Sequence, residues 1–160
     1  MAVTTDIVAT YRGPGAVMRH LLAMGRREDR ALAMAMGACA LTFLSSWPRL
    51  AREAHLQELP LDAQLGGALM AWIFIAPLGL YAVAALSHLV AKVLGGKGDW
   101  YGARLALFWS FLASTPLILL NGLVAGLIGP GPALSLVGLV WCAVFAWFWL
   151  RSLMVAEEGA

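Results

Sequence analysis

His88 is the residue whose type and setting most favour chemistry, because it lies inside a long apolar segment. Residues 63–91 carry no Asp, Glu, Lys or Arg, and His88 lies beside Ser87 near the end of that segment. An ionisable side chain in an apolar span indicates proton or ligand handling. The alternative is a structural role, because Lys92 follows closely and predicts that the imidazole lies near the membrane surface, bonded to water or a carbonyl.

Other residue types that often do chemistry lack the spacing that it requires. Cys39 and Cys142 form no C-x-x-C motif and have no nearby histidine or carboxylate in the sequence, so we expect them to be packing residues. Residues 95–99 read Gly-Gly-Lys-Gly-Asp, which does not match the phosphate-loop pattern and predicts a turn. We therefore predict no catalytic residue, no cofactor site and no metal site.

Two prolines within apolar segments predict kinks at matching depths of antiparallel helices. Pro77 and Pro116 each remove an amide donor and free a carbonyl, which Ser114 or Thr115 can hydrogen-bond. Broken helices at one depth are typical of a transporter's binding site, whereas two packing kinks are the alternative. The path in the first case would be lined by Pro77, His88, Ser114, Pro116 and Asn121.

The elements that must position these residues are predicted to be membrane-spanning helices. The 160 residues are 61% hydrophobic and 12% charged, against about 25% charged in soluble domains, which excludes soluble globular and disordered classes. Charged residues are missing from 31–48, 63–91 and 105–150. One crossing needs about 17–25 residues, and Gly129–Pro132 interrupts the longest stretch. We predict spans over about 31–48, 66–91, 105–128 and 133–150.

The predicted fold is an all-α polytopic membrane protein, a four-transmembrane-helix bundle forming one domain over residues 1–160. A short amphipathic helix is expected over about 14–24, because Pro14 suits a first turn and apolar residues recur at helical spacing. Those apolar residues are Val17, Met18, Leu21, Leu22 and Met24. This helix lies at the membrane interface or packs over the bundle, and the two interpretations are compatible.

Positive residues predict the orientation of the bundle. Nine of the eleven Lys and Arg residues fall on the side that holds both termini, and Arg49 and Arg52 alone fall on the other. The positive-inside rule then places both termini in the cytoplasm. Arg19, Arg26 and Arg27 are the candidate residues for binding anionic lipid or a partner on this face. The net charge of +2 is too small to indicate nucleic-acid binding.

Several segments together resemble the bacterial branch of the Yip-domain family, named for Ypt/Rab-interacting proteins. They are Pro14 to Leu21-Leu22, the Pro77 helix, the glycine-rich loop and residues 100–116, Trp-Tyr-Gly-Ala-Arg-Leu-Ala-Leu-Phe-Trp-Ser-Phe-Leu-Ala-Ser-Thr-Pro. The resemblance implies a helical membrane fold and a non-enzymatic class. Family members typically have five spans, whereas four are predicted here. Eukaryotic members are linked to Rab GTPases and membrane shaping, but neither that partner nor any site residue carries over.

The function expected from these features is binding, in a bacterial inner membrane, of partner proteins or anionic lipid through a basic cytoplasmic face. A membrane-protein partner or a homo-oligomer is compatible with this expectation. The alternative is a small transporter, channel or lipid-moving protein with a path near Pro77, Pro116 and His88. An enzyme would need converging acids at the inner interface, and the acids available there are expected to be solvated. They are Glu28, Asp29, Asp99, Glu157 and Glu158.

Overall fold

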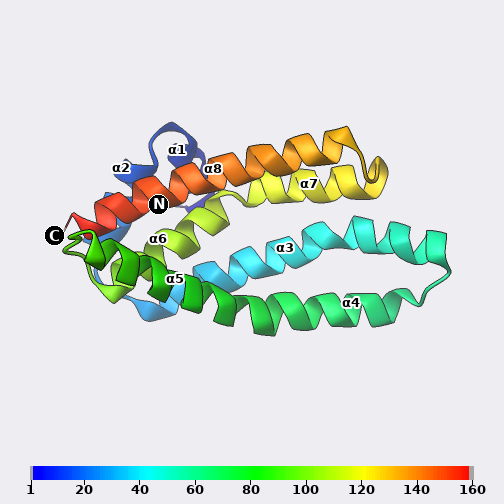
Figure 1. The fold of residues 1–160 in the computed structure, drawn as a ribbon, viewed down its shortest axis with the longest axis horizontal. Coiled ribbons are helices and arrows are strands. Elements are labelled where there is room, and N and C mark those ends of the chain that lie inside the picture. Colours follow the sequence, from blue (N-terminus) through cyan, green and yellow to red (C-terminus); the bar gives the residue numbers. More distant parts are fainter. Residues whose placement is uncertain (1, 159–160) are drawn as a thin grey trace.

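Helix α6 (Trp100–Ala113) lies at the centre of a bundle of long helices (Figure 1). The computed structural model describes residues 2–158, so residues 1, 159 and 160 of the predicted domain lie outside it. Every residue of α6 except Trp100 and Arg104 is buried. An apolar surface on all sides is typical of a helix in a buried core or in a membrane span. The enclosing helices are α3 (Glu28–Gln57), α5 (Ala76–Val93) and α8 (Pro132–Glu157).

Three continuous helical segments are long and apolar enough to cross a membrane. They are α3, α8 and Leu61–Val93, the last built from α4 (Leu61–Met70), η1 (Ala71–Ile75) and α5. Helices α6 and α7 (Thr115–Leu127) together make a fourth candidate span, bent by 44°. The described residues contain no strand. The prediction of an all-α polytopic bundle is therefore confirmed.

Both predicted proline kinks coincide with breaks in regular α-helix. Pro77 follows the π-helical turn η1, and Pro116 follows the junction between α6 and α7 at Ser114. Pro116 lacks the amide that would bond the carbonyl of Leu112, and the hydroxyl of Thr115 donates to that oxygen instead, at 2.7 Å. A side chain thus satisfies the carbonyl that the proline frees.

Glycines bring α7 into close contact with α3. A Cβ added at Gly122 would overlap the carbonyl oxygen of Ser45, and one at Gly126 would overlap Pro48. Arg52 of α3 also donates to the carbonyls of Gly126 and Leu127, at 3.3 and 3.4 Å. Small residues allow helix backbones to approach closely where lipid supplies no hydrophobic drive. This small-residue motif therefore serves packing within the bundle.

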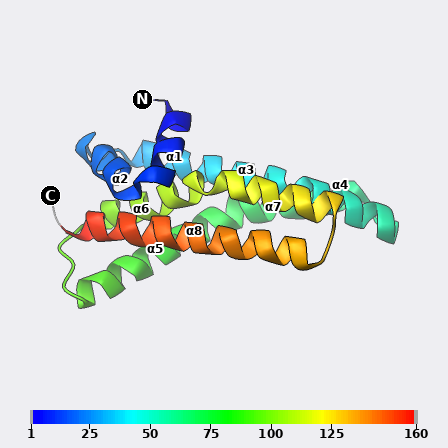
Figure 2. The ribbon, with the colours of Figure 1, turned by 90° about the horizontal axis from the view of Figure 1, so that it is seen from above.

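Two short helices, α1 (Val3–Arg12) and α2 (Pro14–Ala23), pack against one side of the bundle (Figure 2). Pro14 begins α2, whose Val17, Met18 and Leu21 are buried. The prediction of a short amphipathic helix here is confirmed, whereas α1 was not predicted. The indole Nε1 of Trp109 in α6 donates to Thr10 Oγ1 at 3.1 Å, which fixes α1 to the central helix.

Candidate functional site

The glycine-rich loop between α5 and α6 closes over the C-terminal end of α8. Gly95 has a φ of +93°, a left-handed conformation that favours glycine. A Cβ at Gly98 would overlap the carbonyl oxygen of Ala156, and one at Gly96 would crowd the carboxylate of Glu157. The amide of Lys97 donates to the carbonyl of Glu157 at 2.8 Å. The glycines are therefore needed because this loop lies directly on another helix.

His88 and Glu157 form a buried pair beneath this loop. Nδ1 of His88 lies 2.8 Å from Oε1 of Glu157, and Oε2 accepts a hydrogen bond from the amide of Gly98 at 3.1 Å. The exposed fractions of the two side chains are 2% and 8%. The indole of Trp100 covers the imidazole, with ring centroids 4.5 Å apart. These two hydrogen bonds replace contacts with water that the carboxylate loses on burial.

The surroundings and hydrogen-bond partners that the sequence predicted for His88 and Glu157 were wrong. Glu157 was expected to be solvated, and His88 was expected to bond to water or a carbonyl. The structure buries Glu157 because α8 continues to the level of the glycine-rich loop, where the carboxylate meets α5. The sequence did indicate that His88 needs a polar partner, because an ionisable residue in an apolar span is otherwise costly. Spacing along the chain could not identify Glu157 as that partner.

An apolar groove of about 600 Å³ runs between α5 and α8 and ends at Glu157. Val90 of α5, Leu94 just after it, and Leu150 and Met154 of α8 line the groove and are exposed. The His88–Glu157 pair therefore lies where an apolar surface meets a polar loop.

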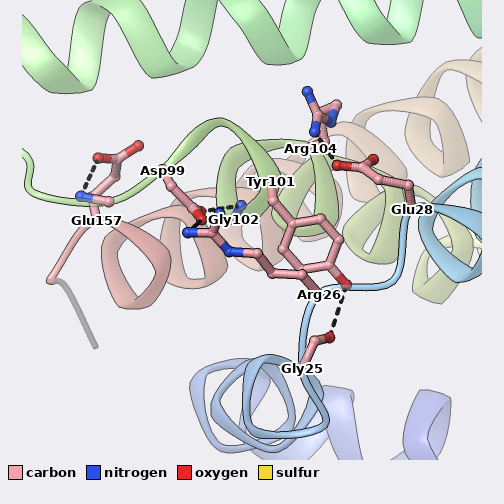
Figure 3. Close-up of polar contacts among 9 residues, drawn as sticks. Gly25, Arg26, Glu28, Asp99, Tyr101, Gly102, Arg104 and Glu157 are labelled. Atoms are coloured by element: carbon pink, nitrogen blue, oxygen red, sulfur yellow. Dashed lines mark hydrogen bonds and ion pairs between the residues drawn. The ribbon is translucent and has the colours of Figure 1, made fainter.

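The three candidate arginines lie at the same end of the bundle but differ in their partners. Arg26 forms an ion pair with Asp99, whose carboxylate also accepts from the amide of Gly102 at 2.7 Å and caps α6 (Figure 3). Arg27 is paired with Asp29 at 2.8 Å, and this hydrogen bond raises the pKa of its guanidinium. Arg19 is exposed and makes no ion pair within residues 2–158.

Further polar contacts join the chain segment after α2 to α6. Arg104 forms an ion pair with Glu28, and Tyr101 donates to the carbonyl of Gly25 at 3.5 Å (Figure 3). Arg30 donates to the hydroxyl of Tyr101 at 3.2 Å. These contacts hold the arginine-bearing segment in a defined position beside the central helix.

The remaining candidate residues lie apart from His88. Pro77 is buried and Pro116 is exposed, whereas Ser114 is buried and accepts a hydrogen bond from Nε1 of Trp141 at 3.1 Å. Asn121 lines a cleft of about 460 Å³ between α3, η1, α7 and α8. Its Oδ1 is buried without a hydrogen-bond partner among the described residues. His88 and Glu157 do not line this cleft.

The chemistry that the described side chains offer in this arrangement is hydrogen bonding and charge. Within residues 2–158 no three His, Cys, Asp or Glu side chains gather in a way that could hold a metal ion. His88 and Glu157 are joined by a buried hydrogen bond, and the arginines can bind an anion.

A family model described as the Yip1 domain matches residues 9–159. No curated protein and no solved structure matches the chain. The matched residues include α2, every long helix, the His88–Glu157 pair and the three candidate arginines.

Proposed function

Because the chain belongs to the Yip1 domain family, we propose that this multi-pass membrane protein acts by binding and not by catalysis. Its binding surface is the basic end of the bundle, which takes up anionic lipid or a partner protein. The observation that carries this proposal is that exposed arginines from separate elements gather at that end, with Arg19 left without an ion pair among residues 2–158. Unpaired guanidinium groups are suited to binding phosphate or carboxylate.

The proposed location is a bacterial inner membrane with both termini in the cytoplasm. Support comes from the division of the eleven Lys and Arg residues, nine of which lie on the side of the termini. A reporter that is active only in the cytoplasm, fused to either end of the chain, is expected to be active. Activity of a periplasmic reporter at the same positions contradicts the orientation.

The binding proposal is tested with the variant Arg19→Gln/Arg26→Gln/Arg27→Gln in the full chain. Purified protein is placed in nanodiscs of phosphatidylcholine with and without phosphatidylglycerol, and retained lipid is measured by native mass spectrometry. We expect the variant to retain less phosphatidylglycerol than the parent, because surface binding of anionic lipid gains about 1 kcal/mol per basic residue.

The control for this experiment is Arg49→Gln, which removes an exposed arginine from α3 near the other end of the bundle. It is expected to leave phosphatidylglycerol retention unchanged. If the triple variant retains as much phosphatidylglycerol as the parent, partner capture is compared in native membranes by crosslinking. A triple variant that also keeps the parent's crosslinked partners contradicts the proposal.

A second candidate function is movement of a solute or lipid, and the cleft at Asn121 favours it. A buried amide oxygen without a partner among the described residues is costly unless a ligand or water satisfies it. The cleft is lined on one side by Thr42, Ser45 and Ser46 of α3. A cleft that holds an amide oxygen without a partner among the described residues, within membrane-spanning helices, is compatible with such a path.

Cysteine accessibility separates the two functions. In a Cys39→Ala/Cys142→Ala background, Asn121→Cys is expected to react with a membrane-impermeant thiol reagent if the cleft is hydrated. Gly79→Cys is the control for a position in a membrane-spanning helix outside the cleft. Gly79 lies exposed on α5 with no atom near its added Cβ, so Gly79→Cys gives the background reaction with which Asn121→Cys is compared. An unreactive Asn121→Cys indicates a dry cleft and contradicts the path.

A further inference from the structure

A hollow of about 310 Å³ lies where α1, α2 and the end of α8 meet, and three arginines from three elements line it. Arg12 ends α1, Arg19 lies in α2, and Arg151 lies in the last turns of α8. Figure 2 shows both short helices beside the C-terminal part of α8. Residues distant in sequence are thus brought together by the docking of the N-terminal helices.

The hollow carries a net positive charge. Its three arginines are exposed, and none makes an ion pair with any residue from 2 to 158. Glu158 is the one acidic side chain among the lining residues. Arginine presents a planar set of donors that matches the oxygens of a phosphate group. An anion in the hollow would relieve the repulsion between the guanidinium groups.

The backbone at this place adds positive potential. Gly13, which caps α2, and Pro14 to Ala16 of its first turn line the same hollow, and Gly15 has an amide from which no residue of that turn accepts a hydrogen bond. The first amides of a helix and its dipole favour an anion nearby. This contribution is secondary, because the arginines alone account for most of the charge.

The rim of the hollow is apolar, which indicates an amphiphilic ligand. Trp147 and Met154 of α8 line it and are 44% and 57% exposed. Tryptophan is enriched where the hydrocarbon meets the headgroups. A ligand with a phosphate head and an acyl tail therefore matches both the arginines and the rim.

We propose that this hollow binds the headgroup of an anionic phospholipid, with Arg12, Arg19 and Arg151 holding the phosphate. The inference rests on the proposed function and narrows its lipid-binding surface to one site. Arg12 and Arg151 are not among the three arginines tested for the proposed function. Of those three, Arg19 lines the hollow, and Arg26 and Arg27 do not.

The test compares Arg12→Gln/Arg151→Gln with the parent in the same nanodiscs of phosphatidylcholine with and without phosphatidylglycerol. Native mass spectrometry gives the affinity for phosphatidylglycerol, which we expect to fall roughly 10-fold for each arginine lost, from the usual strength of a charge-assisted hydrogen bond. The matched control is Arg49→Gln/Lys92→Gln, which removes two exposed basic residues that lie outside the hollow and outside the three arginines of the proposed function.

A second variant keeps the test valid if the first is unstable. Arg12→Lys/Arg151→Lys preserves charge but loses the planar donor set, so its affinity is expected to lie between those of the parent and the glutamine variant. Thermal unfolding in detergent checks that the variants fold. An unchanged phosphatidylglycerol affinity in the glutamine variant overturns the proposal.

The outcomes also separate this site from the wider function. If Arg12→Gln/Arg151→Gln binds normally while Arg19→Gln/Arg26→Gln/Arg27→Gln does not, the site is wrong and the proposed function stands. If neither variant changes lipid binding, both fail. Inorganic phosphate is the competitor: displacement of the lipid by phosphate at equal concentration would assign the hollow to a soluble phosphate and overturn the lipid assignment.

Discussion

The carboxylate of Glu157 lies 2.8 Å from the imidazole Nδ1 of His88, although 69 residues separate them in the chain. The same carboxylate accepts a hydrogen bond from the amide of Gly98. The final turn of α8 is therefore joined both to α5 and to the glycine-rich loop. Since the pair is buried, it contributes to holding these three segments together.

Removing the carboxylate should destabilise this end of the bundle. Glu157→Ala leaves His88 and the amide of Gly98 buried without a partner, and breaking a buried pair costs about 3–5 kcal/mol. We expect a lower free energy of unfolding in a denaturant titration of the detergent-solubilised protein. Glu158→Gln, an exposed neighbour, serves as control and should change little. Equal stability of Glu157→Ala and the parent contradicts the role of the pair.

The close contact of α7 with α3 predicts a marked difference between two glycines. Gly122→Ala would place its methyl group against the carbonyl oxygen of Ser45, so it should lower the free energy of unfolding by about 1–3 kcal/mol. Gly79→Ala meets no atom and should raise it by about 0.5–1 kcal/mol, because alanine favours the helix. Both are measured by unfolding in detergent. Similar changes in the free energy of unfolding at Gly122 and Gly79 would show that the contact of α7 with α3 does not require glycine at position 122.

The hydrogen bond between Trp109 and Thr10 predicts that α1 can be released selectively. Thr10→Val keeps the shape of the side chain but removes the acceptor, which should weaken the docking of α1 by about 1 kcal/mol. Hydrogen exchange of the α1 amides should become faster while exchange in α3 stays unchanged. Thr5→Val, at an exposed position in α1, is the control. Unchanged exchange in α1 would mean that other contacts hold it.

Alkaline pH is expected to act on α1 through Tyr11. Burial raises the pKa of this phenol, which packs edge-on against Phe148. The unfolded pKa is about 10, so the contribution of Tyr11 to stability is complete below that pH and is lost as pH rises through the folded pKa. A phenolate absorbance titration of the parent minus Tyr11→Phe should show a midpoint above that of free tyrosine. A midpoint at or below it contradicts the burial.

Much of the architecture could be predicted from charge, because a charged side chain is costly within hydrocarbon and its absence is visible in the sequence. The chain turns between α7 and α8 at Gly129–Pro132, as the proline and glycine pattern predicted. Proline likewise predicted the breaks near Pro77 and Pro116. These signals are local, so reading them requires no knowledge of how the helices pack.

The site was less predictable because its contacts depend on packing. Glu157 follows an apolar helix and is next to Glu158, and no spacing in the sequence distinguishes the buried acid from the exposed one. Arg12 and Arg151 line the same hollow because α1 packs beside α8. The packing of α1 was hard to predict, because Asp6 and the threonines weaken its apolar pattern. Both relationships join residues that are distant in sequence, and only the docking of helices determines them.

The central place of α6 has a consequence for the order in which the protein assembles during synthesis. α8 leaves the ribosome after every other helix, yet it covers one side of α6 and supplies the partner of His88. Until α8 arrives, a face of the central helix and an imidazole stay open to lipid or to the insertion machinery. The earlier helices must therefore wait in the membrane as a partly formed bundle, and the core around α6 is complete only once α8 has joined it.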